Sequence, residues 1–356
     1  MTRNFNITVM VIDLKKGKRK MKKYHNIIKI FAVAAFLSCT MLTGTVNAAQ
    51  TANEKSISDE LEINKENFST KNLRKQAKKW DLNKDGKLSM EEGSKVTKVV
   101  DTYPVPGIKV KSYSTEFLKW LPNLEELKFQ GISIEQMDLS VNKKLKKLYL
   151  DVCELHTLNI PFLQNLEFLN CDNNSLKKLD VSGLKRLKKL DCENNDLKKL
   201  DLNSLKKLES LGISYNPIKK LNYSGENLKA LYCSGCGLKN LNLKKMKKLK
   251  KLYCNNNQLK KLNVSNNKKL KYLYCEENQL KQLNVKNLKK LDWFSCKGNQ
   301  IKELDVSKNP DLKFLYIENN GMKKLIVSQN LYDNVYEAGL ADYDMLNIKD
   351  IMQVAN

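Results

Sequence analysis

The stretch Leu270-Lys-Tyr-Leu-Tyr-Cys-Glu-Glu-Asn-Gln-Leu-Lys-Gln-Leu-Asn-Val285 decides the fold, because variants of it occur ten times between Leu124 and Val327. The first leucine of each copy recurs every 21 residues, with one step of 20. Around Leu273 and Cys275 apolar and outward-facing residues alternate with the period of a β-strand. Each copy therefore predicts one short strand. The first leucines are Leu124, Leu145, Leu166, Leu187, Leu208, Leu228, Leu249, Leu270, Leu291 and Leu312.

A repeat of this length and pattern predicts a leucine-rich-repeat solenoid. A single repeat cannot bury its own leucines, so neighbouring repeats must stack, and stability is roughly a sum over their interfaces. We therefore expect an α/β fold of about ten 21-residue repeats over residues 124–327. In this fold the strands form a parallel β-sheet on the concave face.

An asparagine three residues after the cysteine follows most of the strands. Its short amide side chain suits a buried turn, because it can bond to backbone groups that would otherwise lack partners. Cys153 and Cys236 replace it in two copies, and Ile132 makes the first copy atypical. The asparagines of this column are Asn174, Asn195, Asn216, Asn257, Asn278, Asn299 and Asn320.

The amino terminus has the pattern of a secretory signal peptide. Basic residues after Met21 precede an apolar run over residues 30–42, and small residues follow at 46–49. The run is shorter than the roughly 18 residues that indicate a membrane span. We expect translation to start at Met21, residues 1–48 to be removed, and the mature chain to lack a transmembrane anchor. A lipoprotein attached through Cys39 is the alternative.

The mature chain is strongly basic. Removal of residues 1–48 takes away nine Lys/Arg and one Asp, which lowers the formal charge from +25 to +17. Paired lysines recur in successive copies, as in Lys177-Lys178 and Lys260-Lys261. Stacking would turn these pairs into stripes that serve either as a solvated outer face or as a surface for anionic wall polymers or phospholipid. Secretion and the lack of a compact basic and aromatic module argue against nucleic acid.

Residues 81–92 match the twelve-residue calcium loop of an EF-hand. Such a loop places oxygen ligands at fixed positions and a glycine at position six, which here is Gly86. The predicted ligands of a single Ca²⁺ are Asp81, Asn83, Asp85, Lys87 through its backbone carbonyl, Ser89 and Glu92. The alternative is an acidic turn in which Asp81 and Asp85 cap helices.

Apolar spacing on both sides of this loop predicts a helix–loop–helix over residues 67–102. Leu73, Ala77 and Trp80 have helical spacing before the loop, as do Val96 and Val99 or Val100 after it. EF-hands usually pair, but the sequence holds no second loop and so no tandem copy of the kind that a dockerin has. We therefore expect a calcium-stiffened helical cap on the first repeat. The segments around it are a linker (49–66), the N-terminal cap of the solenoid (103–123) and a C-terminal cap (328–356).

A signal peptide, one EF-hand-like loop and repeats of this type resemble secreted leucine-rich-repeat proteins of low-GC Gram-positive bacteria, broadly the internalins. The resemblance covers residues 21 to about 330 and implies binding of other macromolecules at or near the cell surface. An immunoglobulin-like module and a Leu-Pro-x-Thr-Gly sorting signal are absent from the sequence after the repeats. The expected location is therefore extracellular, either secreted or associated non-covalently with the cell wall.

Cysteine and histidine give little support for catalysis or zinc binding. Six cysteines share one inward column, where they are expected to pack as small hydrophobic side chains. Cys233 and Cys236 form a lone Cys-x-x-Cys without a second pair. The two histidines are His25 in the signal peptide and His156, and no catalytic partners are evident around either. We therefore expect a protein that is not an enzyme.

The outward-facing strand positions of the last five copies carry aromatic side chains, whereas the early copies carry charged ones such as Asp172, Asp191 and Glu193. The aromatic set is Tyr232, Tyr253, Tyr272, Tyr274, Trp293, Phe314 and Tyr316. Aromatic residues on adjacent strands either bind a ligand, here a protein or a glycan, or pair across strands and stiffen the sheet. The sequence thus predicts a secreted, monomeric binding protein. The alternative is a basic envelope protein with a mainly structural role.

Overall fold

The computed structural model describes residues 60–103, 113–333 and 351–355. The predicted signal peptide (1–48), most of the predicted linker, residues 104–112 of the predicted N-terminal cap and residues 334–350 of the predicted C-terminal cap lie outside the described residues.

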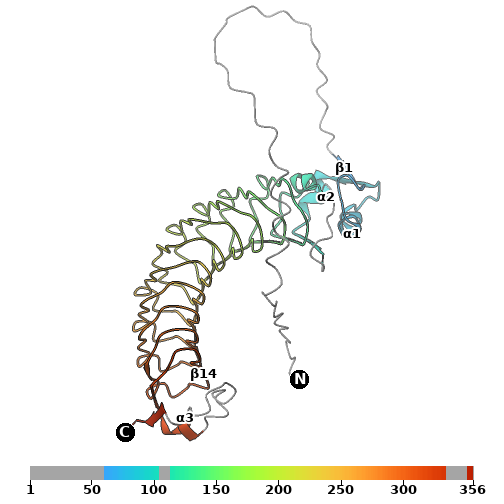
Figure 1. The fold of residues 1–356 in the computed structure, drawn as a ribbon. Helices are drawn as coiled ribbons and strands as arrows, with labels where there is room; N and C mark the ends of the chain where they lie inside the picture. Colours follow the sequence, from blue (N-terminus) through green and yellow to red (C-terminus); the bar gives the residue numbers. More distant parts are fainter. Residues whose placement is uncertain (1–59, 104–112, 334–350, 356) are drawn as a thin grey trace, which may run out of the picture. The chain divides into compact units, whose positions relative to one another are not determined.

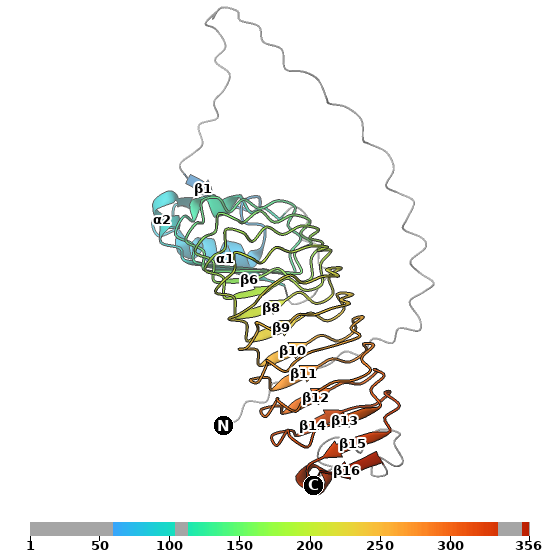
Figure 2. The ribbon, with the colours of Figure 1, turned by 90° about the vertical axis from the view of Figure 1, so that its left-hand side faces the viewer.

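The repeats form a stack of turns, each of which adds one short strand to an eleven-stranded sheet (Figures 1 and 2). All neighbouring strands in this sheet run parallel and in register. The fold prediction of a leucine-rich-repeat solenoid with a parallel sheet is confirmed. The strands are β3 (Lys98–Thr102), β4 (Glu126–Gln130), β5 (Lys147–Asp151), β6 (Phe168–Asn170), β7 (Lys189–Asp191), β8 (Ser210–Gly212), β9 (Ala230–Tyr232), β10 (Lys251–Tyr253), β11 (Tyr272–Tyr274), β12 (Trp293–Ser295) and β14 (Phe314–Tyr316).

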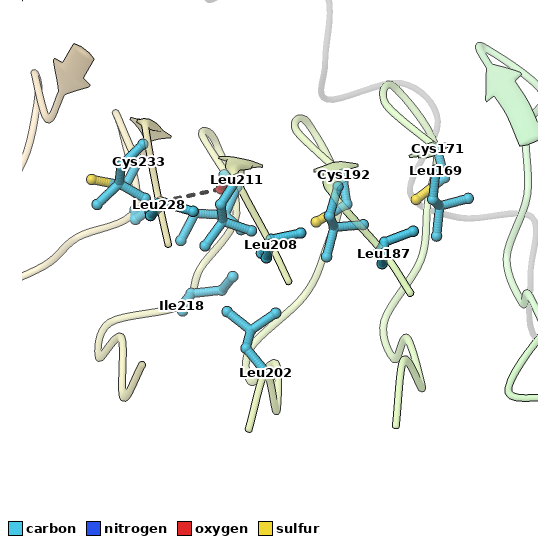
Figure 3. Close-up of a cluster of buried hydrophobic side chains, with 14 of the residues drawn as sticks. Leu169, Cys171, Leu187, Cys192, Leu202, Leu208, Leu211, Ile218, Leu228 and Cys233 are labelled. Atoms are coloured by element: carbon cyan, nitrogen blue, oxygen red, sulfur yellow. Dashed lines mark hydrogen bonds between the residues drawn. The ribbon is translucent and has the colours of Figure 1, made fainter. Parts of the chain in front are cut away.

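Leucines and cysteines fill the interior of the turns, as Figure 3 shows for six of them: Leu169, Cys171, Leu187, Cys192, Leu211 and Cys233. The cysteines of the inward column are fully buried and unpaired. Several of their thiols donate to a backbone carbonyl of the next turn, for example Cys192 Sγ to Gly212 O at 3.4 Å and Cys275 Sγ to Ser295 O at 3.4 Å. The prediction that this column lines the core is confirmed.

The asparagine column connects each turn to the one before it. Asn278 Nδ2 donates to the carbonyls of Cys254, Cys275 and Glu276 at 3.0–3.1 Å, and Asn278 Oδ1 accepts from Leu259 N at 3.0 Å. The side chain therefore satisfies backbone groups of two successive turns. The same arrangement recurs at Asn195, Asn216, Asn257, Asn299 and Asn320.

Cysteine can replace asparagine in this column because the backbone adapts. Cys236 Sγ donates to Ile213 O at 3.2 Å, which keeps one of the donor contacts. A thiol is a weak acceptor. The backbone N–H of the previous turn that would donate to the asparagine side chain therefore bonds to another acceptor. Ile218 N donates to Asn216 O at 2.8 Å, and Ile134 N donates to the backbone carbonyl of Cys153 at 3.0 Å.

The N-terminal cap is built from β1 (Glu60–Glu62), α1 (Lys71–Trp80), β2 (Lys87–Ser89), α2 (Met90–Ser94) and the 3₁₀ helix η2 (Glu116–Trp120). Thr70 caps α1 by accepting from Leu73 N at 2.9 Å and donates to the buried Asp101 of β3 at 2.7 Å. Asp101 also accepts from the hydroxyl of Tyr113 at 2.9 Å. This buried carboxylate joins the cap to the first strand of the solenoid sheet.

Two expectations for the N-terminal cap were wrong. The second helix ends at Ser94, and Val99, which we expected on that helix, lies in β3 and pairs with Leu127 of β4. The run Lys98-Val-Val-Asp-Thr102 favours a strand because its β-branched residues pack well on a half-buried sheet. Residues 60–62 were expected to be linker, but they form β1, which runs antiparallel to β2 and places Leu61 opposite Leu88.

A three-stranded sheet joins the last repeats to the described part of the C-terminal cap. It contains β13 (Glu303–Asp305), β15 (Lys324–Val327) and β16 (Met352–Val354), all parallel, and α3 (Gln329–Asp333) precedes the gap in the description. Leu331 and Met352 are buried against the last turns. Within the described residues, no helix combines the length and apolar character that crossing a membrane requires.

Candidate functional site

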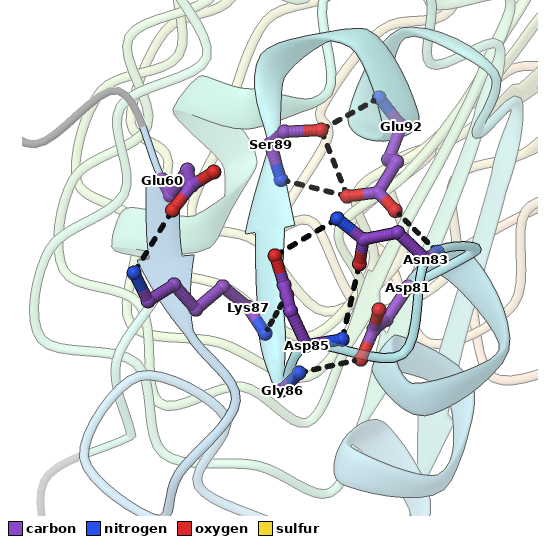
Figure 4. Close-up of polar contacts among 8 residues, drawn as sticks. All are labelled: Glu60, Asp81, Asn83, Asp85, Gly86, Lys87, Ser89 and Glu92. Carbon is purple, nitrogen blue, oxygen red and sulfur yellow. Dashed lines mark hydrogen bonds and ion pairs between the residues drawn. The ribbon is translucent and has the colours of Figure 1, made fainter.

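The predicted calcium loop lies between α1 and α2, and its side chains turn back on its own backbone (Figure 4). Asp81 Oδ2 accepts from Gly86 N at 3.0 Å, Asn83 Oδ1 from Asp85 N at 3.0 Å, and Asp85 Oδ1 from Lys87 N at 2.8 Å. Gly86 has φ +82°, a left-handed conformation that glycine adopts without steric cost. The loop thus has the tight turn that its sequence predicts.

One oxygen in this loop stands out because it is buried without a partner. Asp81 is only 8% exposed, and its Oδ1 makes no hydrogen bond. A buried, unpaired carboxylate oxygen costs free energy, and a cation is one way to satisfy it. This atom therefore fits a bound metal ion.

Glu92, at position twelve, is engaged by hydrogen-bond donors of the protein. Its Oε2 accepts from Ser89 N at 3.0 Å and Ser89 Oγ at 2.8 Å, and its Oε1 accepts from Leu82 N at 2.7 Å. These bonds, led by that from the Ser89 backbone, lower the pKa of Glu92 to about 2. The pair Ser89 and Glu92 also forms a capping box for α2. Over residues 60–103, 113–333 and 351–355, no three His, Cys, Asp or Glu side chains converge as a metal centre.

The sheet face, meaning the outward-facing residues of the eleven-stranded sheet, carries the predicted aromatic residues. Tyr232, Tyr253 and Tyr274 lie opposite one another in register, and so do Tyr272, Trp293 and Phe314. Tyr316 continues the first row after Ser295. All seven predicted aromatic side chains are half-buried on this face.

Six of these rings form a continuous stack, which we call the aromatic ladder: Tyr232, Tyr253, Tyr274, Trp293, Phe314 and Tyr316. The Tyr253 and Tyr274 rings stack most evenly, with centroids 4.5 Å apart and planes 13° from parallel. Trp293 stacks on both Tyr274 and Tyr316, at 6.1 and 5.8 Å, and so continues the ladder past Ser295. Tyr272 lies beside the ladder, with Lys251 Nζ 5.4 Å from its ring centroid.

Two polar atoms within the ladder lack partners. Trp293 Nε1 and Ser295 Oγ are buried and make no hydrogen bond, and Ser295 is 1% exposed. Buried polar groups are normally satisfied. The centre of the ladder thus holds an unused donor and an unused hydroxyl.

The other half of the sheet face carries a set of carboxylates, which we call the acidic cluster: Asp151, Asp172, Asp191 and Glu193. Burial, and after it the charges of Asp191 and Asp151, raises the pKa of Asp172 to about 6, although a hydrogen bond from Glu193 N opposes the shift. Burial, followed by the charges of Asp172 and Asp191, raises the pKa of Glu193 to about 7. One lysine offsets part of this charge, with Lys189 Nζ 2.7 Å from Asp191 Oδ2.

The absence of a side chain at Gly212 gives the acidic cluster its space. Gly212 stands in register between Asp191 and Tyr232, and a Cβ there would come within 2.7 Å of Glu193 Oε1. The sequence placed these acids outward but gave no reason to regard them as a site. The available signal was that carboxylates recur at neighbouring positions in successive repeats.

A cavity and a histidine are the features of the described residues that bear on catalysis. A cavity of about 730 Å³ lies away from the sheet face, lined by residues that include Leu262, Leu283 and Leu304. Two of its charged lining residues, Lys286 and Asp305, pair with each other at 3.1 Å. His156 is exposed and does not line this cavity.

No protein-family model and no curated protein matches the sequence. Among solved structures, the chain is similar to the functional domain of InlJ from Listeria monocytogenes, which includes a cysteine ladder. The identity is 25% and the TM-score 0.65, over 76% of this chain and 66% of that one. A leucine-rich-repeat protein of Leptospira interrogans is 29% identical, with a TM-score of 0.50 over 53% of this chain and 52% of the other.

The internalin InlF from Listeria monocytogenes is similar in fold alone, with 19% identity and a TM-score of 0.50 over 85% of this chain and 98% of that one. The chain spans about two thirds of the InlJ domain and about half of the Leptospira protein. These neighbours support an internalin-like leucine-rich-repeat fold.

Proposed function

We propose that the protein is a secreted or surface-associated binding protein that recognises a macromolecule through the aromatic ladder. The observation that carries this proposal is a run of six stacked rings on an open sheet face. Tyrosine and tryptophan are favoured binding anchors, and contiguous exposed apolar surface is uncommon on soluble monomers.

Stiffening of the sheet is the competing role for these rings, and a matched pair of variants separates the two. Tyr253 and Tyr274 stack at 4.5 Å in the ladder, and Tyr149 and Phe168 stack at the same distance outside it. The Tyr253→Ala/Tyr274→Ala variant should lose captured protein or glycan ligand, whereas Tyr149→Ala/Phe168→Ala should keep it. Equal loss of stability without any difference in binding would assign the ladder to sheet packing.

We also propose that residues 81–92 bind one Ca²⁺ that stabilises the N-terminal cap. The supporting observation is the buried, unpaired Asp81 Oδ1 in a loop that carries Asn83, Asp85 and Glu92 at the ligand positions. The carbonyl of Lys87 and the side chain of Ser89 complete the predicted ligands. When bound, the ion would supply charge compensation for these carboxylates and cross-link the loop.

Terbium provides a direct test, because Trp80 directly precedes Asp81 and can sensitise its luminescence. Terbium emission should rise on terbium addition, fall when Ca²⁺ competes, and disappear in the Asp81→Asn variant. In a separate melting experiment, EDTA should lower the melting temperature of the protein. Glu91→Gln is the control, since Glu91 is exposed on α2 and pairs only with Lys95 among the contacts described. Unchanged melting with Ca²⁺ and with EDTA would count against the site.

The lysine stripes support a second proposal, in which the mature chain is held at the cell surface by charge. The paired lysines at 177–178, 198–199, 219–220 and 260–261 are all exposed. Attraction to an anionic wall polymer weakens as salt screens it. Release from cells by high salt, with the aromatic variants behaving as wild type, would favour this mainly structural role over ligand recognition.

A further inference from the structure

The sheet face changes its chemistry along the stack. The acidic cluster lies on β5 to β7 and the turns that follow them, and the aromatic ladder occupies β9 to β14. The boundary is the row Asp191, Gly212, Tyr232, whose members are paired in register on adjacent strands. Two strand spacings of about 4.8 Å place the carboxylate and the first ladder ring roughly 10 Å apart. The two surfaces are therefore neighbours on one face.

The negative charge of the acidic cluster contrasts with the net charge of the molecule. The whole sequence has a formal charge of +25, yet four carboxylates gather here with Lys189 as the cation paired to them. Asp151 is held by the neutral amides of Gln130 and Asn173, at 3.0 and 2.8 Å. Neutral donors orient a carboxylate but leave its charge available to a partner.

We infer that the partner is a cationic polypeptide segment, whose Lys or Arg side chains contact the acidic cluster while adjacent apolar or aromatic side chains lie on the ladder. The inference rests on the proposed function and names the class of ligand that the sheet face fits. Charge complementarity selects a cation, and the half-buried stacked rings offer apolar edges that the alkyl stems of its Lys or Arg side chains can contact. The geometry of an open sheet suits an extended segment rather than a small molecule.

The arrangement at Gly212 supports this path for the ligand. Gly212 is buried and has no side chain, and the carboxylates of Asp191 and Glu193 lie over its backbone, next to Tyr232 in register. A segment that crosses the face along this row meets the acids first and the rings next.

The test uses the full mature chain and two fluorescein-labelled octapeptides, Lys-Arg-Lys-Gly-Tyr-Leu-Tyr-Leu and its charge-reversed partner Glu-Asp-Glu-Gly-Tyr-Leu-Tyr-Leu. Binding is followed by fluorescence anisotropy. We expect the cationic peptide to bind and the charge-reversed peptide to fail. The Asp191→Asn/Glu193→Gln variant should bind the cationic peptide about tenfold or more weakly than wild type. Its affinity should also rise less steeply than that of wild type as the salt concentration falls. Glu303→Gln, an exposed acid on β13, is the charge control.

The outcomes separate the inference from the proposed function. Equal affinity of the cationic peptide for wild type and Asp191→Asn/Glu193→Gln would overturn the inference. Binding of a neutral glycan to wild type but not to the Tyr253→Ala/Tyr274→Ala variant would also overturn the inference. That result would still identify the ladder as the binding surface. Peptide binding that is insensitive to the ladder variant would instead refute the proposed function. Melting curves confirm that each variant is folded before its affinity is compared.

Discussion

The asparagine column yields the sharpest stability prediction, and Asn278 is its best test position. Its amide donates to Cys254 O and Cys275 O and accepts from Leu259 N. Asn257 also bonds to Cys254 O, and Asn299 also bonds to Cys275 O. Both carbonyls therefore keep a partner in Asn278→Ala, whereas the Leu259 N–H loses the acceptor described for it.

The magnitude follows from that difference. A buried donor left unsatisfied costs about 1–3 kcal/mol, and each ordinary hydrogen bond contributes about 0.5–1.5 kcal/mol net. Because the carbonyls keep second partners, we expect Asn278→Ala to lower the free energy of unfolding by roughly 2–4 kcal/mol. Asn278→Asp should cost more, since its carboxylate would face the same carbonyls that the amide now bonds.

Asn278→Cys is the informative control, because Cys153 and Cys236 occupy this column naturally. The thiol keeps a donor, as Cys236 Sγ does toward Ile213 O, but it is a poor acceptor. Its cost should therefore lie below that of Asp and near or below that of Ala. Urea unfolding followed by circular dichroism and by tryptophan fluorescence measures the series. Losses under about 1 kcal/mol for Ala and Asp alike, or a Cys variant less stable than Asp, would refute this account of the column.

Three further predictions follow from particular contacts. Asp172 has a folded pKa of about 6, above the ordinary value of about 3.9, so its ionisation opposes folding; this cost is absent below about pH 4 and complete above about pH 6. Asp172→Asn should thus raise the free energy of unfolding near pH 7.5 by up to about 3 kcal/mol, seen as a higher melting temperature, and should have little effect near pH 4. Gly183→Ala should destabilise the chain more than Gly212→Ala, because its Cβ would collide with the backbone carbonyl of Pro161, whereas at Gly212 it meets the movable end of Glu193; equal melting temperatures would contradict this. Burial raises the pKa of the Cys254 thiol to about 12, so it should react with a maleimide only after urea unfolds the chain, and fast labelling of folded protein would show that the column is accessible.

Much of the solenoid could be predicted from sequence because one pattern is repeated. The leucine period fixed the strands, and the inward position of Cys275 and its equivalents followed from alternation with Tyr272 and Tyr274. A register error of one residue would have turned the side chains of a strand to the opposite face of the sheet. The ten copies all agree on one register, so the assignment was secure.

The parts that sequence did not predict lie where no repeat constrains the chain. Val99 has helical spacing to Val96, but pairing with Leu127 in the sheet decides its conformation. Leu61 lies in a segment without a recognisable pattern, and only its packing opposite Leu88 makes it a strand. Tertiary contacts outweigh local preference at such positions.

The structural role of a second set of asparagines was also not predicted, because these residues stand where most other copies have leucine. They are Asn142, Asn267 and Asn309. Asn267 Nδ2 donates to Leu243 O and Met246 O of the previous turn, while its Oδ1 is buried without a partner. A polar residue in a leucine column gives no sign from sequence of which backbone groups it will reach.

The parallel register of the sheet has a consequence for how this surface can change over evolution. Each turn contributes one outward residue to each row, and the contacts between neighbours are alike from β9 to β14. Duplication of one 21-residue unit, such as residues 249–269, would insert one tyrosine and leave the interfaces on both sides chemically unchanged. Duplication or deletion of one repeat can therefore lengthen or shorten the recognition surface by one strand, and the packing of the core stays the same.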